Sequence, residues 1–150
     1  MADFWKEDEP LPEEALLQDL AWADAVVAGP GLSKSRTAKE LLVFTVQHTE
    51  VPLVLDADAL NLIAEDAEIL SGCRAEKILT PHVGELARLL HMTIAECQRD
   101  PAGSAGRAAE KYQACCVRKD SVTVTAEEGR EQYYINTSGS SALATAGSGD

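Results

Sequence analysis

Pro52–Leu60, PLVLDADAL, is the stretch that decides the fold. Its first part, Pro52–Leu55, is a short and wholly apolar run, which is typical of a strand buried on both faces of a parallel sheet. The polar segment Asp56–Asp58 follows at once, and a helical pattern runs from Leu60 to Leu70. The stretch therefore predicts a strand, a loop and a helix in succession, the unit from which parallel sheets are built.

Similar units lie on both sides of this stretch. Ala25–Ala28 (AVVA) is apolar throughout and suits a central parallel strand, and Gly29-Pro30-Gly31 ends it sharply. Lys77–Thr80 (KILT) is expected to form the third strand. Residues 1–12 are acidic, carry two prolines and are expected to be loop or tail. Further helices are predicted over residues 36–48, 85–90, 94–99 and 101 to about 115.

The last third of the chain predicts a different strand arrangement. Val117–Val124 is expected to hold one or two strands, Glu127–Gly129 a turn, and Gln132–Ile135 a returning strand. These strands would form an antiparallel edge beside the parallel ones. We therefore expect an α/β protein with a mostly parallel sheet, helices on both of its faces and, at 150 residues, a single domain.

Composition narrows the range of partners. The formal net charge is −12, so the chain lacks the basic surface that nucleic acid or an anionic membrane would require. It has no long apolar run and no signal peptide, which argues against secretion and favours a cytoplasmic protein. The cysteines form no C-x-x-C pair and are interpreted as reduced thiols used in packing: Cys73, Cys97, Cys115 and Cys116.

Four polar or glycine-containing loops follow predicted strands directly. They contain Gly29–Gly31, Asp56–Asp58, His82 and the glycine turn at Gly147–Gly149. Ligands of open α/β sheets bind outside the carboxyl ends of the strands, so these loops predict one shared site. Several of these features have an alternative interpretation. Gly29–Gly31 could be only a tight turn, and Asp56 and Asp58 could cap a helix instead of binding Mg²⁺ or ligand hydroxyls. Lys119, which follows a later predicted strand, could be either a solvated lysine or a phosphate contact.

The segment Asn136–Asp150, NTSGSSALATAGSGD, ends in a glycine-rich turn. Gly147 and Gly149 leave backbone N–H groups accessible, and such a turn at the start of a helix forms an anion cradle. Asp150 beside that cradle would accept a proton from a hydroxyl or hold a metal ion. The alternative is a flexible Gly/Ser tail, because a short G-x-G is a weak signal.

Together these loops resemble a known family. GPGLS (Gly29–Ser33), DADAL (Asp56–Leu60), TPHVGE (Thr80–Glu85) and ALATAGSGD (Ala142–Asp150) occur in the order seen in ribokinase-like NAD(P)H-hydrate dehydratases. The similarity extends from about Trp22 to Asp150. It implies a ribokinase-like three-layer α/β/α sandwich, with a mostly parallel sheet and an antiparallel edge.

The resemblance implies a reaction as well as a fold. Family members return hydrated, damaged NADH or NADPH to its active form, with ADP or ATP and Mg²⁺, and are often fused to an epimerase. They commonly form homo-oligomers. Two alternatives remain: a related kinase acting on a vitamin precursor, and a non-catalytic nucleotide-binding or assembly module.

Residue roles carry over position by position. By resemblance Asp150 is the catalytic base and contacts the reacting hydroxyl, and Gly31 and His82 line the substrate pocket. By the same resemblance, Asp56 and Asp58 lie toward the nicotinamide ring or the metal ion. The resemblance does not say which residues bind the metal ion. The adenine nucleotide would contact Lys119, Asp120, Ser121, Val122, Thr123, Gly147 and Gly149.

The chain departs from the family pattern in three loops. Val83 replaces the second proline of T-P-H-P-G-E, Asp120 replaces the glycine of Lys-Gly, and Ser140 replaces an asparagine. Asp120 would place a carboxylate near the phosphate path and weaken nucleotide binding. The family's earlier Lys-x-x-x-Gly stretch and first strands are also missing, so we expect a truncated domain that is inactive by itself.

Overall fold

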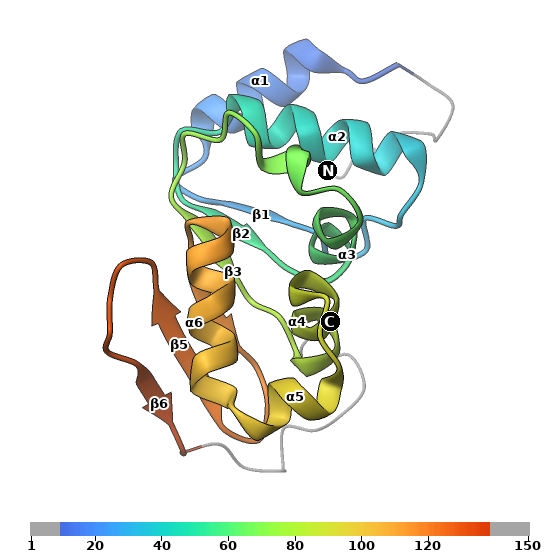
Figure 1. Ribbon diagram of the computed structural model, residues 1–150. Helices are drawn as coiled ribbons and strands as arrows, with labels where there is room; N and C mark the ends of the chain where they lie inside the picture. Colours follow the sequence, from blue (N-terminus) through green and yellow to red (C-terminus); the bar gives the residue numbers. More distant parts are fainter. Residues whose placement is uncertain (1–9, 139–150) are drawn as a thin grey trace.

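A computed structural model describes residues 10–138, and within that range six strands form one sheet in the order β1-β2-β3-β4-β5-β6 (Figure 1). The first four strands pair in parallel, and β5 and β6 complete an antiparallel edge. The predicted mixed sheet is therefore confirmed. The strands are β1 (Val26–Ala28), β2 (Leu53–Leu55), β3 (Lys77–Leu79), β4 (Cys115–Arg118), β5 (Thr123–Glu127) and β6 (Tyr134–Asn136).

Helices connect the parallel strands, as the sequence predicts. They are α1 (Glu13–Trp22), α2 (Arg36–His48), α3 (Ala57–Glu65), α4 (Val83–Leu90), α5 (Ile94–Arg99) and α6 (Pro101–Tyr112), with a 3₁₀ turn η1 at Ala67–Leu70. The bounds of α2 and α5 are those predicted. The α3 helix begins three residues early, at Ala57. The α6 helix ends at Tyr112 because Gln113 takes a left-handed conformation, with φ of 50°.

Polar caps explain where several helices begin. The Ser35 side chain accepts from the Ala38 N–H at the start of α2. Thr93 and Glu96 form a reciprocal capping box on α5. Each such cap satisfies N–H groups that the first helical turn leaves without a partner. Because these signals are local, the sequence alone was enough to find both helix starts.

One face of the sheet carries the core. Leu55, Leu79 and Cys116 are in register across β2, β3 and β4, and all three are fully buried. Paired residues of neighbouring strands point to the same face. The core residues of that face pack against buried side chains of α2, α3, α4 and α6. The α6 helix contacts β4 and β5, and it passes in front of β5 in Figure 1.

The opposite face is more open. Val54 and Ile78 are only partly buried there, and Val27 is 64% exposed. Among the described strands β1 is at the edge and pairs only with β2, so the expectation of a central position for Ala25–Ala28 is wrong within residues 10–138. Of the three layers that the family fold implies, the described residues supply the sheet and the helices of one face.

Gly29 fixes the junction between β1 and β2. Its φ is +124°, and a Cβ added there would lie 1.8 Å from the backbone oxygen of Asp56. Gly129 also has a positive φ, +69°, but a Cβ there would meet nothing within 4 Å.

We expect Gly29→Ala to lower the free energy of unfolding by more than about 3 kcal/mol, because it adds a backbone clash to an unfavourable φ. Gly129→Ala should cost only about 1 kcal/mol, since it introduces the unfavourable φ alone. Urea denaturation of both variants measures the difference. Equal losses would show that the contact with Asp56 is not the constraint.

Candidate functional site

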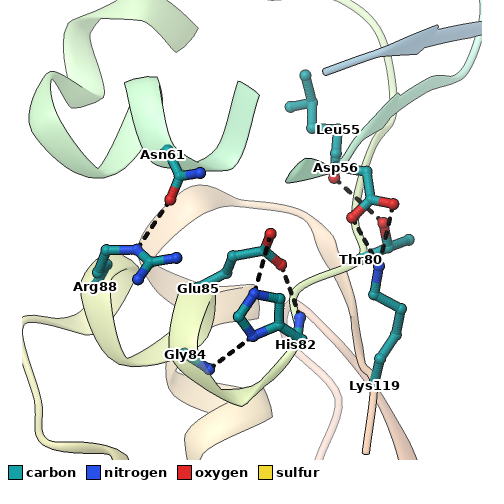
Figure 2. A network of polar contacts seen from close by, with 9 residues as sticks. All are labelled: Leu55, Asp56, Asn61, Thr80, His82, Gly84, Glu85, Arg88 and Lys119. Carbon is teal, nitrogen blue, oxygen red and sulfur yellow. Dashed lines mark hydrogen bonds and ion pairs between the residues drawn. The ribbon is translucent and has the colours of Figure 1, made fainter. Parts of the chain in front are cut away.

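The carboxyl ends of the neighbouring strands β2, β3 and β4 bring polar residues together (Figure 2). Asp56 follows β2, Thr80 and His82 follow β3, and Lys119 follows β4. Because the strands run in parallel, these residues reach the same edge of the sheet. The predicted convergence of the Asp56 and His82 loops is therefore observed in the geometry.

Lys119 ties these loops to one another. Its Nζ lies 2.8 Å from Oδ1 and 3.1 Å from Oδ2 of Asp56, which is 63 residues away in the chain. The Lys119 N–H donates to the Pro81 carbonyl at 2.8 Å, beside a bridge between His82 and Lys119. Lys119 is thus neither a freely solvated lysine nor an open phosphate contact in this conformation, because a carboxylate holds its ammonium group.

The two aspartates after β2 have different partners. Asp56 occupies the cap position of α3, but its side chain makes no capping hydrogen bond and binds Lys119 instead. Asp58 Oδ2 accepts from the Ser33 N–H at 3.0 Å and so holds the loop that follows β1. Asp56 thus occupies the cap position that the sequence allowed for one of the two aspartates, but its side chain does not cap the helix.

Gly31 lies in that same loop, with φ of +69° and open space where a Cβ would be. A shallow cavity of about 320 Å³ adjoins it and is lined by Gly31, Leu32, Ser33, Ser35, Thr37, Ala38 and Leu41. Asp58 is linked to this loop through Ser33. The side chain of Asp58 therefore links the aspartate segment to the loop that contains the predicted site residue Gly31.

His82 is the N-cap residue of α4, and several of its atoms form hydrogen bonds. Its Nδ1 accepts from the Gly84 N–H at 3.0 Å, and its own N–H donates to Glu85 Oε2 at 2.8 Å. Val83, which replaces a family proline, is the first residue of α4, a position where proline is favoured. Here the capping box fixes the loop that proline would otherwise stiffen.

Glu85 is a site residue that the sequence reasoning did not single out. Its side chain is only 7% exposed, and both of its oxygens face His82. The usable signal was the spacing: a carboxylate three residues after a loop residue, at the start of an apolar helix, is the capping-box pattern.

Arg118 explains how the chain accommodates Asp120. The Arg118 side chain is only 2% exposed, and its Nη2 lies 2.9 Å from Asp120 Oδ2. The other carboxylate oxygen, Oδ1, accepts from the Ser121 N–H at 2.7 Å. The carboxylate expected to repel phosphate is therefore paired with a cation and shapes the turn between β4 and β5.

Some of the remaining predicted site residues lie within the described range and others lie outside it. Ser121 and Val122 lie in the bend between β4 and β5, and Thr123 begins β5. Gly147, Gly149 and Asp150 lie outside the described residues. Within residues 10–138 no group of three His, Cys, Asp or Glu side chains is placed to hold a metal, and Asp56 and Asp58 each already have a partner.

The cysteines are free thiols, as predicted. Burial raises the pKa of Cys97, and it raises the pKa of Cys116 to about 12. A thiol with so high a pKa is a poor nucleophile, so Cys116 contributes packing. No helix in the described range, 10–138, has both the length and the apolar character needed to cross a bilayer.

The mixed sheet and the polar edge of its parallel strands define an α/β protein of ribokinase-like architecture. The chain belongs to the NAD(P)H-hydrate dehydratase family, whose model matches residues 5–150. The family that the four loop motifs indicated is therefore confirmed.

Known proteins align along most of the chain. It is 43% identical over 138 residues to the bifunctional NAD(P)H-hydrate repair enzyme of Moorella thermoacetica, covering 91% of this chain and 26% of that protein. It is 43% identical over 131 residues to the ADP-dependent (S)-NAD(P)H-hydrate dehydratase of Neisseria meningitidis, covering 85% and 44%.

The crystal structure of the ADP/ATP-dependent NAD(P)H-hydrate dehydratase from Bacillus subtilis, co-crystallized with ATP/Mg²⁺ and soaked with CoA, superposes with a TM-score of 0.72 at 28% identity. The superposition covers 89% of this chain and 49% of the Bacillus chain. The chain thus spans between about a quarter and a half of the length of these relatives.

We expect Asp120→Ala to lower the free energy of unfolding by about 2–3 kcal/mol, because it leaves the buried guanidinium of Arg118 without its ion-pair partner. The control is Glu40→Ala, which removes the exposed pair with Arg36 and should cost less than about 0.5 kcal/mol. Chemical denaturation compares them. A loss for Asp120→Ala no larger than the control's would contradict the role given to the pair.

Proposed function

We propose that the protein dehydrates hydrated NADH or NADPH, using ADP or ATP. The observation that supports this most strongly is the family match over residues 5–150, joined to the placement of the aspartate and histidine loops at one sheet edge. The Neisseria relative is named as ADP-dependent and the Bacillus one as ADP/ATP-dependent. The family's nucleotide use is therefore part of the proposal for this chain.

The proposed reaction has two steps that balance chemically. The hydroxyl of the hydrated ring attacks the terminal phosphoryl group of the nucleotide and loses its proton, and AMP leaves when the donor is ADP. The ring nitrogen then supplies the electron pair that expels phosphate and leaves a C=N iminium, and loss of a proton from the neighbouring ring carbon restores the C=C double bond of the ring. The phosphorylation is useful because phosphate is a much better leaving group than hydroxide.

Residues of three loops and of the terminal turn would share the roles in this reaction. Asp150 would accept the hydroxyl proton, and the N–H groups of Gly147 and Gly149 would stabilise the transferred phosphoryl group. Gly31, His82, Asp56 and Asp58 would position the hydrated ring. These assignments come from the family pattern at matching positions.

The segment from Lys119 to Thr123 would contact the nucleotide, and Lys119 is well placed to do so. Its ammonium group rests on Asp56 at the edge where the phosphates would arrive. A phosphate could compete for it there, because lysine binds phosphate as a mobile point charge. Mg²⁺ commonly binds through one or two carboxylates together with substrate phosphates, so it would enter with the nucleotide.

The same proposal covers partners. The Moorella relative is named bifunctional, so an epimerase domain on the same or a separate chain is the expected partner. We further propose that residues 1–150 form a single, truncated catalytic domain, that the protein is a homo-oligomer and that it is cytoplasmic. The binding-module alternative draws less support once Asp120 is paired with Arg118, because that carboxylate no longer carries an uncompensated charge.

The test is recovery of the reduced-nicotinamide absorbance. Hydrated NADH is mixed with Mg²⁺ and either ADP or ATP, using this chain and a version extended at both ends to the length of its relatives. We expect the extended version to restore the absorbance, and Asp150→Asn to reduce the rate by at least about 100-fold, the contribution of a positioned base.

The outcomes separate the candidates. Recovery with release of AMP from ADP supports the dehydratase and excludes a simple ATP-dependent kinase. Silence from both versions with both nucleotides, while ADP still binds by calorimetry, would reject the dehydratase in favour of the binding module.

A further inference from the structure

We propose that Glu85 is a positioning residue that fixes His82 as a hydrogen-bond donor through Nε2. The inference rests on the proposed function in one respect, the identity of the acceptor: His82 would donate to an oxygen of the hydrated substrate. The arrangement of the ring itself is a property of the described residues and is tested separately.

The first step concerns the tautomer of the ring. His82 Nδ1 lies 3.0 Å from the backbone N of Gly84, whose N–H must donate because a backbone amide nitrogen has no other role. A ring nitrogen that accepts a hydrogen bond carries no proton. In the neutral ring the proton is therefore on Nε2.

The second step concerns the group that faces Nε2. Glu85 Oε1 lies 3.4 Å from His82 Nε2, while Oε2 accepts from the His82 N–H at 2.8 Å. An ionised carboxylate can only accept, so it favours a proton on the nitrogen it faces. Both contacts act in the same direction: Gly84 requires a bare Nδ1, and Glu85 favours a protonated Nε2 (Figure 2).

Gly84 allows the ring to lie where it does. A Cβ at this position would be 2.8 Å from Cε1 and 3.2 Å from Nδ1 of His82. The ring therefore occupies space that any other residue at position 84 would fill. The glycine after Val83 serves ring placement, and the close approach is what brings Nδ1 onto the N–H group.

The third step concerns what is left for a ligand. The 3.4 Å separation exceeds an ordinary N–H···O distance of about 2.7–3.2 Å, so the Nε2 proton is oriented without being fully engaged. The His82 side chain is 52% exposed, whereas that of Glu85 is buried. His82 can thus donate to a hydroxyl or carbonyl oxygen, and its other nitrogen is unavailable as a base.

A second capping box in the chain supplies the matched control. At α5 the Thr93 N–H donates to Glu96 Oε2 at 2.8 Å, and Thr93 Oγ1 accepts from the Glu96 N–H at 3.2 Å. The glutamate accepts from the N–H of the capping residue, as it does at α4. The capping side chain has no ring, however, and accepts from the N–H three residues on, whereas His82 accepts from the N–H two residues on. Glu96→Gln therefore changes a capping-box carboxylate without affecting any tautomer.

The first measurement uses ¹⁵N NMR of the histidine ring nitrogens in this chain. We expect the neutral His82 ring to carry its proton on Nε2, and Glu85→Gln to shift the ring nitrogens toward a mixture of tautomers, because an amide N–H can face Nε2. Glu96→Gln should leave the His82 signals unchanged. A proton on Nδ1 in the unsubstituted chain, or no shift in Glu85→Gln, would overturn the inference.

The second measurement uses the extended version in the dehydratase assay. We expect Glu85→Gln to raise the KM for the hydrated dinucleotide about tenfold, the effect of weakening one hydrogen bond, with the nucleotide KM unchanged. Glu96→Gln should change neither. If Glu85→Gln changed the KM values of the dinucleotide and the nucleotide equally, Glu85 would be only a structural cap and the positioning role would be overturned. The same conclusion would follow if Glu85→Gln and Glu96→Gln changed the dinucleotide KM equally.

A further variant keeps the test valid if Glu85→Gln folds poorly. His82→Asn retains a side-chain oxygen that can accept from the Gly84 N–H but lacks Nε2. We expect it to raise the same KM, and Glu85→Gln added to it to have little further effect; full additivity would contradict action through His82. If no version turns over, the proposed function fails while the NMR result still decides the tautomer.

Discussion

The parallel register of β2, β3 and β4 is the constraint on which the rest of the structure depends. Leu55, Leu79 and Cys116 stand side by side and are fully buried, so the strands must end at the same edge. A shift of one residue would turn these side chains to the opposite face. The hydrophobic core thereby fixes where Asp56, His82 and Lys119 meet, although none of those three belongs to it.

Part of the fold and site was predictable because it depends on local chemistry. Apolar runs predicted the strands, and the helix starts predicted at residues 36 and 94 are those that Ser35 and Thr93 cap in the structure. The meeting of the Asp56 and His82 loops followed from the rule that the carboxyl ends of parallel strands lie at one edge of the sheet. Pairings over long range were not predictable: no pattern in the chain indicates that Lys119 binds Asp56, or that β1 lies at the edge among the strands of residues 10–138.

Asp120 illustrates how a single sequence position can mislead. Viewed alone, a carboxylate beside a phosphate path is a liability. In the structure its neighbour Arg118 points to the buried face of β4 and pairs with it. A buried arginine is costly unless paired, and an aspartate near phosphate is unfavourable unless neutralised. Each residue offsets part of the other's cost, so Asp120 is best understood together with Arg118.

Val83 and Glu85 lead to a similar conclusion about His82. A proline after the histidine would restrict the loop through its own backbone, whereas this chain holds the loop through a buried carboxylate that bonds to the histidine N–H. The carboxylate has a further effect that a proline could not have, because it faces the ring and favours a proton on Nε2. Gly84 and Glu85 together set the position and the orientation of the ring, which makes those two residues part of the site.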